Sequence, residues 1–143
     1  MKFIPILESN PSQEMLDLLG KGIDEFNISK TGFSGNRDLT FFVRDEQENI
    51  IGGVHGNFNQ SGWLYISAIW VAESHRSQGI GLDLMEYIEK EAIKNGCVHS
   101  YLNTIEFQAP KFYEKMGYEI FATLENFHDG FNKYFLKKEL KGT

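Results

Sequence analysis

The chain has 143 residues, a typical length for one domain, and 41% of them are hydrophobic, which is enough to form a core. Its formal net charge of −6 argues against a general nucleic-acid binder, because such proteins carry a basic face. Its one cysteine, Cys97, excludes an intrachain disulfide and is typical of the cytoplasm, and no stretch approaches the length of a membrane span. We therefore predict a single cytoplasmic domain over residues 1–143 that binds neither nucleic acid nor membrane.

The first part of the chain predicts a strand and then a helix. Residues 3–7 are expected to form an edge strand, because Pro5 cannot donate a hydrogen bond inside a sheet. Asn10 and Pro11 are residue types typical of the N-cap and first position of a helix. A polar loop is expected over residues 29–36. The apolar stripe of the predicted helix consists of Met15, Leu18, Leu19, Ile23 and Phe26.

Three strands are predicted next. Residues 39–44 and 50–58 are expected to pair as a hairpin around a turn at 45–49. A second turn at 59–62 leads into the apolar run 64–71. This run is rich in β-branched and aromatic residues, which is typical of a buried strand.

A basic, glycine-containing loop follows this strand, with Arg76, Gly79 and Gly81 in the spacing Arg-x-x-Gly-x-Gly. Apolar residues then recur with helical periodicity from Ile80 to Lys94, and Gly96 is placed to end the helix in the left-handed conformation. The first amides of a helix lack intrahelical partners and carry partial positive charge, and glycines leave that backbone open to a bulky anion. Arg76 adds a permanent cation with the right geometry for phosphate. The pattern predicts an anion site at the start of the helix.

Two common phosphate-binding loops do not fit this stretch. A Walker A loop needs Gly-Lys-Ser/Thr, which does not follow here, and a dinucleotide fingerprint needs a third glycine where Leu84 stands. An ordinary glycine-rich turn that enters a helix remains an alternative to an anion site.

The remaining elements complete an α/β fold. Residues 98–104 are predicted as a strand, 109–116 as a short helix, and 118–124 and 131–140 as a hairpin around 126–130. The strand before the central helix and the strand after it form a β-α-β unit, so they should be parallel. The expected order is β-α-β-β-β-α-β-α-β-β. The predicted fold class is a mixed, mostly antiparallel central sheet with one parallel β-α-β unit and helices on both faces.

The short helix carries a second motif, Ala-Pro-Lys-Phe-Tyr-Glu-Lys-Met-Gly-Tyr, from Ala109 to Tyr118. The two motifs, in this order and spacing, resemble those of the GNAT superfamily of acetyl-CoA-dependent N-acetyltransferases. The resemblance extends over roughly the whole chain and is sharp from Trp63 to Tyr118. It implies the GNAT fold, in which the two parallel strands splay apart, and acetyl-CoA as co-substrate.

The resemblance also implies roles for individual residues. The phosphates of the cofactor would lie on the amides of residues 77–82, and the pantetheine would lie along residues 69–71. Tyr113 would be the acid that protonates the departing thiolate, and packing of its ring on the core is the alternative reading. Glu106 stands where the family often has an asparagine that contacts pantetheine, which leaves that contact to Asn103 or Gln108. The implied cofactor-binding residues are Ile69, Trp70, Val71, Arg76, Ser77, Gln78, Gly79, Ile80, Gly81, Leu82, Asn103 and Gln108.

The acceptor side of the reaction is left open by the sequence. The resemblance implies a small amine or an exposed amino group as acceptor, with a homodimer as one option for assembly. An acyl-CoA-binding module without turnover is the alternative function. The histidines show no ligand spacing, so no metal is predicted. The candidates for the base are Tyr65, Ser67, Glu106 and His128.

Overall fold

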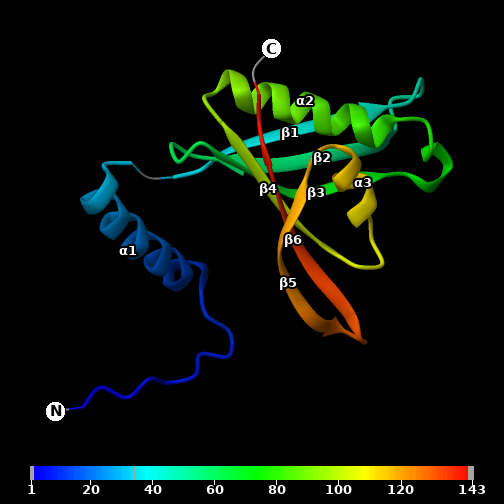
Figure 1. Cartoon of the computed structure of the whole chain (residues 1–143). Coiled ribbons are helices and arrows are strands. Elements are labelled where there is room, and N and C mark those ends of the chain that lie inside the picture. The colour runs from blue at the N-terminus through cyan, green and yellow to red at the C-terminus, as the bar shows by residue number, and fades with distance from the viewer. Residues whose placement is uncertain (1, 34, 142–143) are drawn as a thin grey trace. The chain divides into compact units, whose positions relative to one another are not determined.

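The computed structural model describes residues 2–33 and 35–141 (Figure 1). The chain divides into two compact units, Met1–Gly35 and Asn36–Thr143. The single domain predicted from the sequence stays a prediction. Among the described residues, no helix is long and apolar enough to cross a membrane.

The first unit contains one helix, α1 (Gln13–Thr31). Its N-cap is Ser12, whose hydroxyl accepts a hydrogen bond from the backbone N–H of Met15 at 3.2 Å. The prediction of Asn10 as N-cap is therefore wrong. Asparagine and serine are both good N-caps, so residue type alone does not predict which of them caps the helix. The start of the first helical turn at Gln13 makes Ser12 the cap.

The end of α1 and the segment before it also differ from expectation. Gly32 adopts the left-handed conformation (φ 80°) and donates its N–H to the carbonyl of Ile28 at 2.8 Å, so the helix extends into the predicted loop at 29–36. The prediction of a strand at residues 3–7 is wrong, since these residues form no regular structure. A strand is stabilised by a neighbour that takes its backbone hydrogen bonds, and the sheet described below has no strand from this segment.

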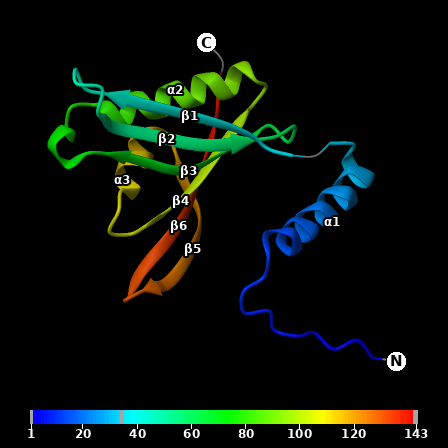
Figure 2. The same cartoon turned by 180° about the vertical axis from the view of Figure 1, so that it is seen from behind.

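The second unit is built on a six-stranded sheet of order β1-β2-β3-β4-β6-β5. Only the β3–β4 pair is parallel, so the predicted mixed sheet with one β-α-β unit is confirmed. The antiparallel β1–β2–β3 meander is clearest from behind (Figure 2). The strands are β1 (Arg37–Arg44), β2 (Ile50–Phe58), β3 (Trp63–Val71), β4 (His99–Ile105), β5 (Glu119–His128) and β6 (Phe131–Glu139).

Two helices and a short turn complete this unit: α2 (Ile80–Lys94), α3 (Pro110–Lys115) and the 3₁₀ turn η1 (Glu73–His75). Gly96 has a φ of 93°, as expected of the residue that ends α2. The β5–β6 hairpin is tighter than predicted, because Asp129 and Gly130 alone separate its strands and both have positive φ. Two successive left-handed residues match the twist of a two-residue hairpin.

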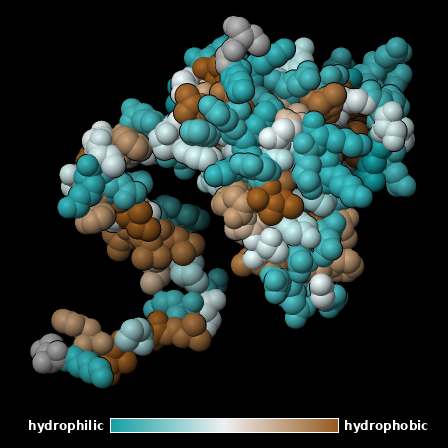
Figure 3. Space-filling model, in the orientation of Figure 1, coloured by the Kyte–Doolittle hydropathy of each residue, from teal (hydrophilic) through white to brown (hydrophobic). Residues whose placement is uncertain are grey.

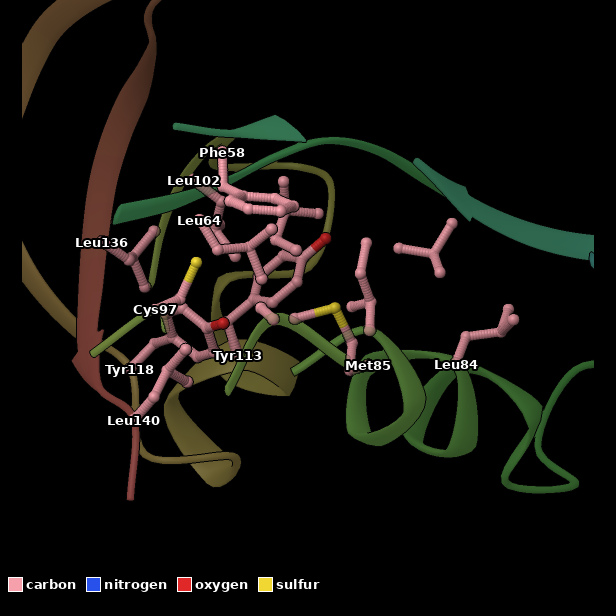
Figure 4. Close-up of a cluster of buried hydrophobic side chains, with 14 residues drawn as sticks. Phe58, Leu64, Leu84, Met85, Cys97, Leu102, Tyr113, Tyr118, Leu136 and Leu140 are labelled. Atoms are coloured by element: carbon pink, nitrogen blue, oxygen red, sulfur yellow. The ribbon is translucent and has the colours of Figure 1, made fainter. Parts of the chain in front are cut away.

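The core of this unit lies between the sheet and its helices. Met85 and Ile88 on α2 are fully buried in one cluster with Val54 of β2 and Leu64 of β3. Figure 4 shows Met85 and Leu64 in this cluster. The outward surface over α2 is mainly hydrophilic (Figure 3). This amphipathic division is the one expected from the helical periodicity, and burial of such side chains is worth about 1.5–3 kcal/mol each.

Gly56 shows how closely β2, β3 and α2 approach one another. A Cβ at this position would lie 2.6 Å from the carbonyl oxygen of Tyr65 and 3.2 Å from Cδ1 of Ile88. Because a backbone carbonyl in a ladder cannot move away cheaply, only glycine fits here.

We predict that Gly56→Ala lowers the free energy of unfolding by about 1–3 kcal/mol, the scale of an overpacked core. Chemical denaturation monitored by tryptophan fluorescence would measure it. Gly20→Ala is the control, because nothing lies within 4 Å of a Cβ there and alanine is the better helix former. An unchanged midpoint for Gly56→Ala would show that the β3 backbone yields without cost.

Candidate active site

The site begins where β3 and β4 separate. They pair over only three positions, Trp63–Tyr65 with His99–Tyr101, although β3 continues to Val71 and β4 to Ile105. Beyond the paired positions the two strands run apart (Figure 1). The sheet therefore has an opening between two of its central strands.

A cavity of about 630 Å³ occupies this opening, within the size range of small-molecule sites. Residues from both faces of the sheet line it: Leu102 and Thr104 are buried on the face that α2 covers, while Asn103 between them faces the other side. The cavity is therefore bounded by residues of both faces. Its lining consists of Ile66, Ser67, Ala68, Ile69, Trp70, Val71, Arg76, Gly81, Leu102, Asn103, Thr104, Gln108, Ala109, Phe112 and Tyr113.

The β2–β3 ladder decides which backbone groups face the cavity. The N–H of Ala72 donates to the carbonyl of Ile51 at 2.8 Å, which fixes the phase of the ladder. Because antiparallel pairs alternate between bonded and non-bonded positions, the N–H and C=O groups of Ile69 and Val71 point away from β2. The backbone of Trp70 instead points toward β2. Ile69 and Val71 therefore offer an extended ligand free main-chain groups, whereas Trp70 offers its half-exposed side chain.

A β-bulge at Ser67 sets this phase. His55 of β2 pairs with Ala68 and Gly56 pairs with Ile66, so Ser67 is the extra residue. Its hydroxyl donates to the carbonyl of His55 at 3.1 Å. The bulge has no signature in the sequence pattern, and it is the reason that residues after it face differently from a regular strand.

The loop between β3 and α2 has the conformation of an anion cradle. Ser77 and Gly79 are both left-handed (φ 66° and 84°), and Gly79 is the N-cap of α2. Glycine has no side chain to cap a helix, so the first amides of α2, those of Ile80, Gly81 and Leu82, are left for solvent or a ligand. A Cβ at Gly79 would meet nothing within 4 Å. The loop is open on this side, and Gln78 belongs to the same turn.

Gly81 is a glycine for a different reason. A Cβ there would lie 3.3 Å from Cζ of Phe112, a tight contact with the ring on α3. The close approach of α2 and α3 therefore explains this glycine without reference to an anion. The sequence suggested that Gly79 and Gly81 both leave room for an anion. In the structure, Gly79 forms a left-handed turn and Gly81 makes room for Phe112.

Arg76 is anchored at the end of β3. Its Nε donates to the carbonyl oxygen of Val71 at 3.0 Å, and the side chain lines the cavity. One of the two free carbonyls of β3 is thus satisfied from within the chain. The guanidinium has further N–H groups that can meet a phosphate.

Tyr113 comes from α3 and is nearly buried, with a ring that packs among the core side chains (Figure 4). It also lines the cavity. Burial raises the pKa of Tyr113 above its ordinary value of 10.0. Its hydroxyl is therefore protonated at neutral pH and can act as a donor. Packing and a role at the cavity are both compatible with this geometry.

Asn103 and Gln108, the two candidates for the missing asparagine contact, both line the cavity but are bonded differently. Oε1 of Gln108 accepts from the hydroxyl of Thr104 at 3.0 Å and from the N–H of Ile105 at 2.7 Å, so it closes the loop after β4. The Asn103 amide donates to the hydroxyl of Tyr65 at 3.1 Å. This bond joins β3 to β4 where their ladder is lost.

The four base candidates are not equivalent in position. Ser67 lines the cavity. Tyr65 does not line it, but its hydroxyl accepts a hydrogen bond from Asn103, which does. Oε1 of Glu106 accepts the N–H of Asn132, and His128 lies 3.8 Å from a carboxylate oxygen of Asp129 in the hairpin. Neither Glu106 nor His128 is in the lining of the cavity. In the described part of the chain, no group of three or more His, Cys, Asp or Glu is placed to hold a metal ion.

Phe112 and Thr104 are lining residues that the sequence did not single out. Phe112 lies in the second motif beside Tyr113, so its position was visible but its contact with Gly81 was not. Thr104 was predicted only as the end of a strand, and nothing in its neighbourhood signals the bond to Gln108.

The cavity thus combines an open helix N-terminus, free strand backbone and a protonated tyrosine. The fold is that of the GNAT acetyltransferases. The family model described as the acetyltransferase (GNAT) family matches residues 10–118. The chain belongs to this family, and it is an N-acetyltransferase by membership.

Individual relatives agree with this membership. The acetyltransferase Atu2258 of Agrobacterium fabrum is 33% identical over 113 residues, which cover 79% of this chain and 82% of that protein. The blasticidin-S acetyltransferase of Streptomyces morookaense is 34% identical over 96 residues, or 66% of this chain and 70% of its own length. The crystal structure of a proposed acetyltransferase from Agrobacterium tumefaciens superposes with a TM-score of 0.86 at 29% identity, covering 97% of this chain and 99% of the other.

We predict that Arg76→Ala weakens coenzyme A binding about 10- to 150-fold, the equivalent of losing a hydrogen bond to a charged group. Isothermal titration calorimetry would measure it. Arg76→Lys is the matched variant, because it keeps the charge but loses the Nε–H that holds Val71, and it should fall between wild type and Arg76→Ala. Equal affinity for all three proteins would contradict the placement of a phosphate beside Arg76.

Proposed function

We propose that the chain transfers an acetyl group from acetyl-CoA to a primary amine, which attacks the thioester directly. The observation that carries this proposal is the cavity between β3 and β4, with the Arg76 loop near one part of its lining and Tyr113 at another. Acetyl-CoA carries its phosphates and its thioester at opposite ends of a long arm, so it needs an extended cavity with an anion site at one end. This cavity has Arg76 and Tyr113 in its lining.

The cofactor would use the chain in two ways. Its pyrophosphate would lie on the amides of residues 77–82, where the helix dipole and Arg76 favour negative charge. Its pantetheine arm would add beside β3 like a short strand. The free C=O group of Ile69 and the N–H of Val71 support this placement, since the Val71 carbonyl is already taken by Arg76.

The acetyl carbonyl would lie against the N–H of Ile69. An uncharged amine nitrogen forms a bond to the carbonyl carbon, the oxygen becomes an anion, and a main-chain donor already in place would stabilise it. The C–S bond then breaks and coenzyme A leaves as a thiolate. The extra proton of the new amide passes to a base or to water.

Tyr113 would supply the proton that the thiolate takes up. A thiol has a pKa of about 8.5 and tyrosine about 10, so this transfer is uphill by roughly 2 kcal/mol in water. Burial raises the pKa of Tyr113 further and makes its hydroxyl a weaker acid. Tyr113 would therefore act through its position at the sulfur, as a hydrogen-bond donor that completes transfer late in the step.

The amine would enter from the face of the sheet opposite α2. Asn103 faces that side, and Ser67 in the bulge lies at the same opening. An amine with a pKa near 10 must lose a proton before it attacks. Ser67 and Tyr65, acting through water, are better placed for this than Glu106 or His128. A relative acts on the antibiotic blasticidin S, which supports small amine-bearing molecules as the first acceptors to test.

The experiment that tests the function is release of free thiol from acetyl-CoA in the presence of an amine panel: polyamines, aminoglycosides, nucleoside antibiotics, amino acids and peptides. We expect amine-dependent release with at least one class. Acetyl-CoA should also raise the melting temperature by mass action, whereas ATP and NAD, which lack pantetheine, should raise it less. A thermal shift without release for any amine would favour the alternative, an acyl-CoA-binding module without turnover.

We predict that Tyr113→Phe keeps the fold and acetyl-CoA binding, because the ring is retained, but lowers kcat at least about tenfold, toward the lower end of general-acid effects. Steady-state kinetics on the best amine would measure kcat, and acetyl-CoA titration would check binding. Phe112→Leu is a control for packing beside it, with a smaller expected loss. If the chemical step is rate-limiting and Tyr113→Phe keeps the wild-type kcat, then Tyr113 has a packing role and is not the acid.

A further inference from the structure

A buried polar cluster surrounds the hydroxyl of Tyr118, five residues after the proposed acid Tyr113. The Tyr118 hydroxyl is 2.9 Å from Oε2 of Glu89 on α2 and 2.8 Å from the Ser100 hydroxyl on β4. Lys138 of β6 donates to the other carboxylate oxygen of Glu89 at 2.8 Å. All but Lys138 are less than a tenth exposed. A buried carboxylate is tolerated only when it is fully paired, so this cluster needs each of its members.

Tyr118 is tied to Tyr113 through the backbone. The N–H of Tyr118 donates to the carbonyl of Tyr113 at 3.1 Å, across a turn in which Gly117 has a φ of 96°. The helix that carries Tyr113 has only six residues. A helix this short has no stability of its own, so contacts at its two ends hold Tyr113 in place.

Both of those contacts go to α2. At one end the ring of Phe112 packs where Gly81 has no Cβ, and at the other Tyr118 bonds Glu89. Gly81 and Glu89 are two turns apart on α2, about 12 Å along its axis. The Tyr113 ring lies between the two contacts, with its centroid 5.2 Å from that of Phe112 and 6.1 Å from that of Tyr118.

We propose that Tyr118 is a positioning residue whose hydrogen bond to Glu89 sets how far Tyr113 reaches toward the reacting sulfur. This inference rests on the proposed function. The first amides of α2 would fix the cofactor phosphates, and the same helix holds α3 through Glu89. The distance from the phosphate end to the acid is then set by one rigid helix.

The hydroxyl of Tyr118, not its ring, carries this role. Phenylalanine would fill the same space but leave Oε2 of Glu89 and the Ser100 hydroxyl without their shared partner. Burial, together with the charge of Glu89, raises the pKa of Tyr118 far above that of an ordinary tyrosine. The hydroxyl therefore remains a donor at any pH at which the enzyme would work.

A double-mutant cycle tests the inference. In the wild-type background, Tyr118→Phe should lower kcat at least about fivefold and change the KM for acetyl-CoA less than about twofold. In a Tyr113→Phe background, the same change should alter kcat less than about 1.5-fold, because residues that act as a unit are not additive. The coupling is a readout that a purely structural role would not produce.

Two further variants make the cycle decisive. Phe58→Leu trims a core residue that pairs with Leu64 at the start of β3 and does not line the cavity, and it should lower the melting temperature without changing kcat. Ser100→Ala removes one partner of Tyr118 and leaves Glu89 in place, so kcat should fall about twofold in the wild-type background alone. If Tyr118→Phe does not unfold cooperatively, Ser100→Ala carries the same cycle.

Each outcome is informative. Unchanged kcat for Tyr118→Phe, or an equal loss in both backgrounds, would overturn the positioning role while leaving the proposed function intact. Wild-type kcat for Tyr113→Phe would instead remove the acid that the inference requires and overturn the inference, whereas the proposed acetyl transfer is tested separately by amine-dependent thiol release. Loss confined to the background with Tyr113 supports the inference.

Discussion

The interruption of the β3–β4 ladder is the constraint on which the rest of the second unit depends. Two adjacent parallel strands stop pairing after three positions, and each unpaired N–H or C=O buried without a partner has a free-energy cost. Side chains of the same chain satisfy some of these unpaired groups. Arg76 takes the Val71 carbonyl, Asn103 and Tyr65 bond across the gap, and Gln108 closes the turn after β4. Among the backbone groups left over, the C=O of Ile69 and the N–H of Val71 are the ones that the proposed pantetheine arm would bond.

Two glycines allow close packing between the sheet and its helices. Gly56 lets β2, β3 and α2 meet within van der Waals contact, and Gly81 lets α3 approach α2. Glycine is therefore used here for close approach in the core, and at Gly79 for a left-handed turn, two different properties of the same residue.

Much of the fold was predictable because its signals are local. Period-two alternation, glycine turns and the stripe of α2 located most strands and the main helix, and the two motifs pointed to the family. The failures have different causes, one a missing partner in the sheet and the other the choice between two nearby cap residues. Residues 3–7 have strand-like composition but no neighbour in the sheet, and Asn10 and Ser12 are both suitable caps until the first turn is placed.

The sequence named candidate positions but not their arrangement. Arg76 and Gly79 stand out by their spacing in a basic, glycine-containing loop, and Tyr113 was implied by the family resemblance. The separation of β3 and β4, the bond from Arg76 to Val71 and the contact of Gly81 with Phe112 involve residues that no local pattern links. The direction of the Trp70 backbone groups could not be predicted either. It depends on which residues of β3 and β2 form bonded pairs, and the bulge at Ser67 changes that pairing by one residue.

That bulge makes the length of β3, as well as its composition, part of the site. Counting from the well-packed start of the strand, Ser67 is the residue that shifts the pairing of Ile69 and Val71 with β2 by one position. Because Ser67 is the extra residue, loss of a single residue there would leave a regular ladder in which Ile69 still pairs with Val54. It would remove the local bend and the bond from Ser67 to the carbonyl of His55. A reading of related chains that compares residue types alone would miss this. The spacing between Tyr65 and Arg76 is therefore a feature to compare among relatives, because a spacing shorter by one residue indicates a β3 without the bulge and without the hydroxyl that Ser67 brings to the cavity.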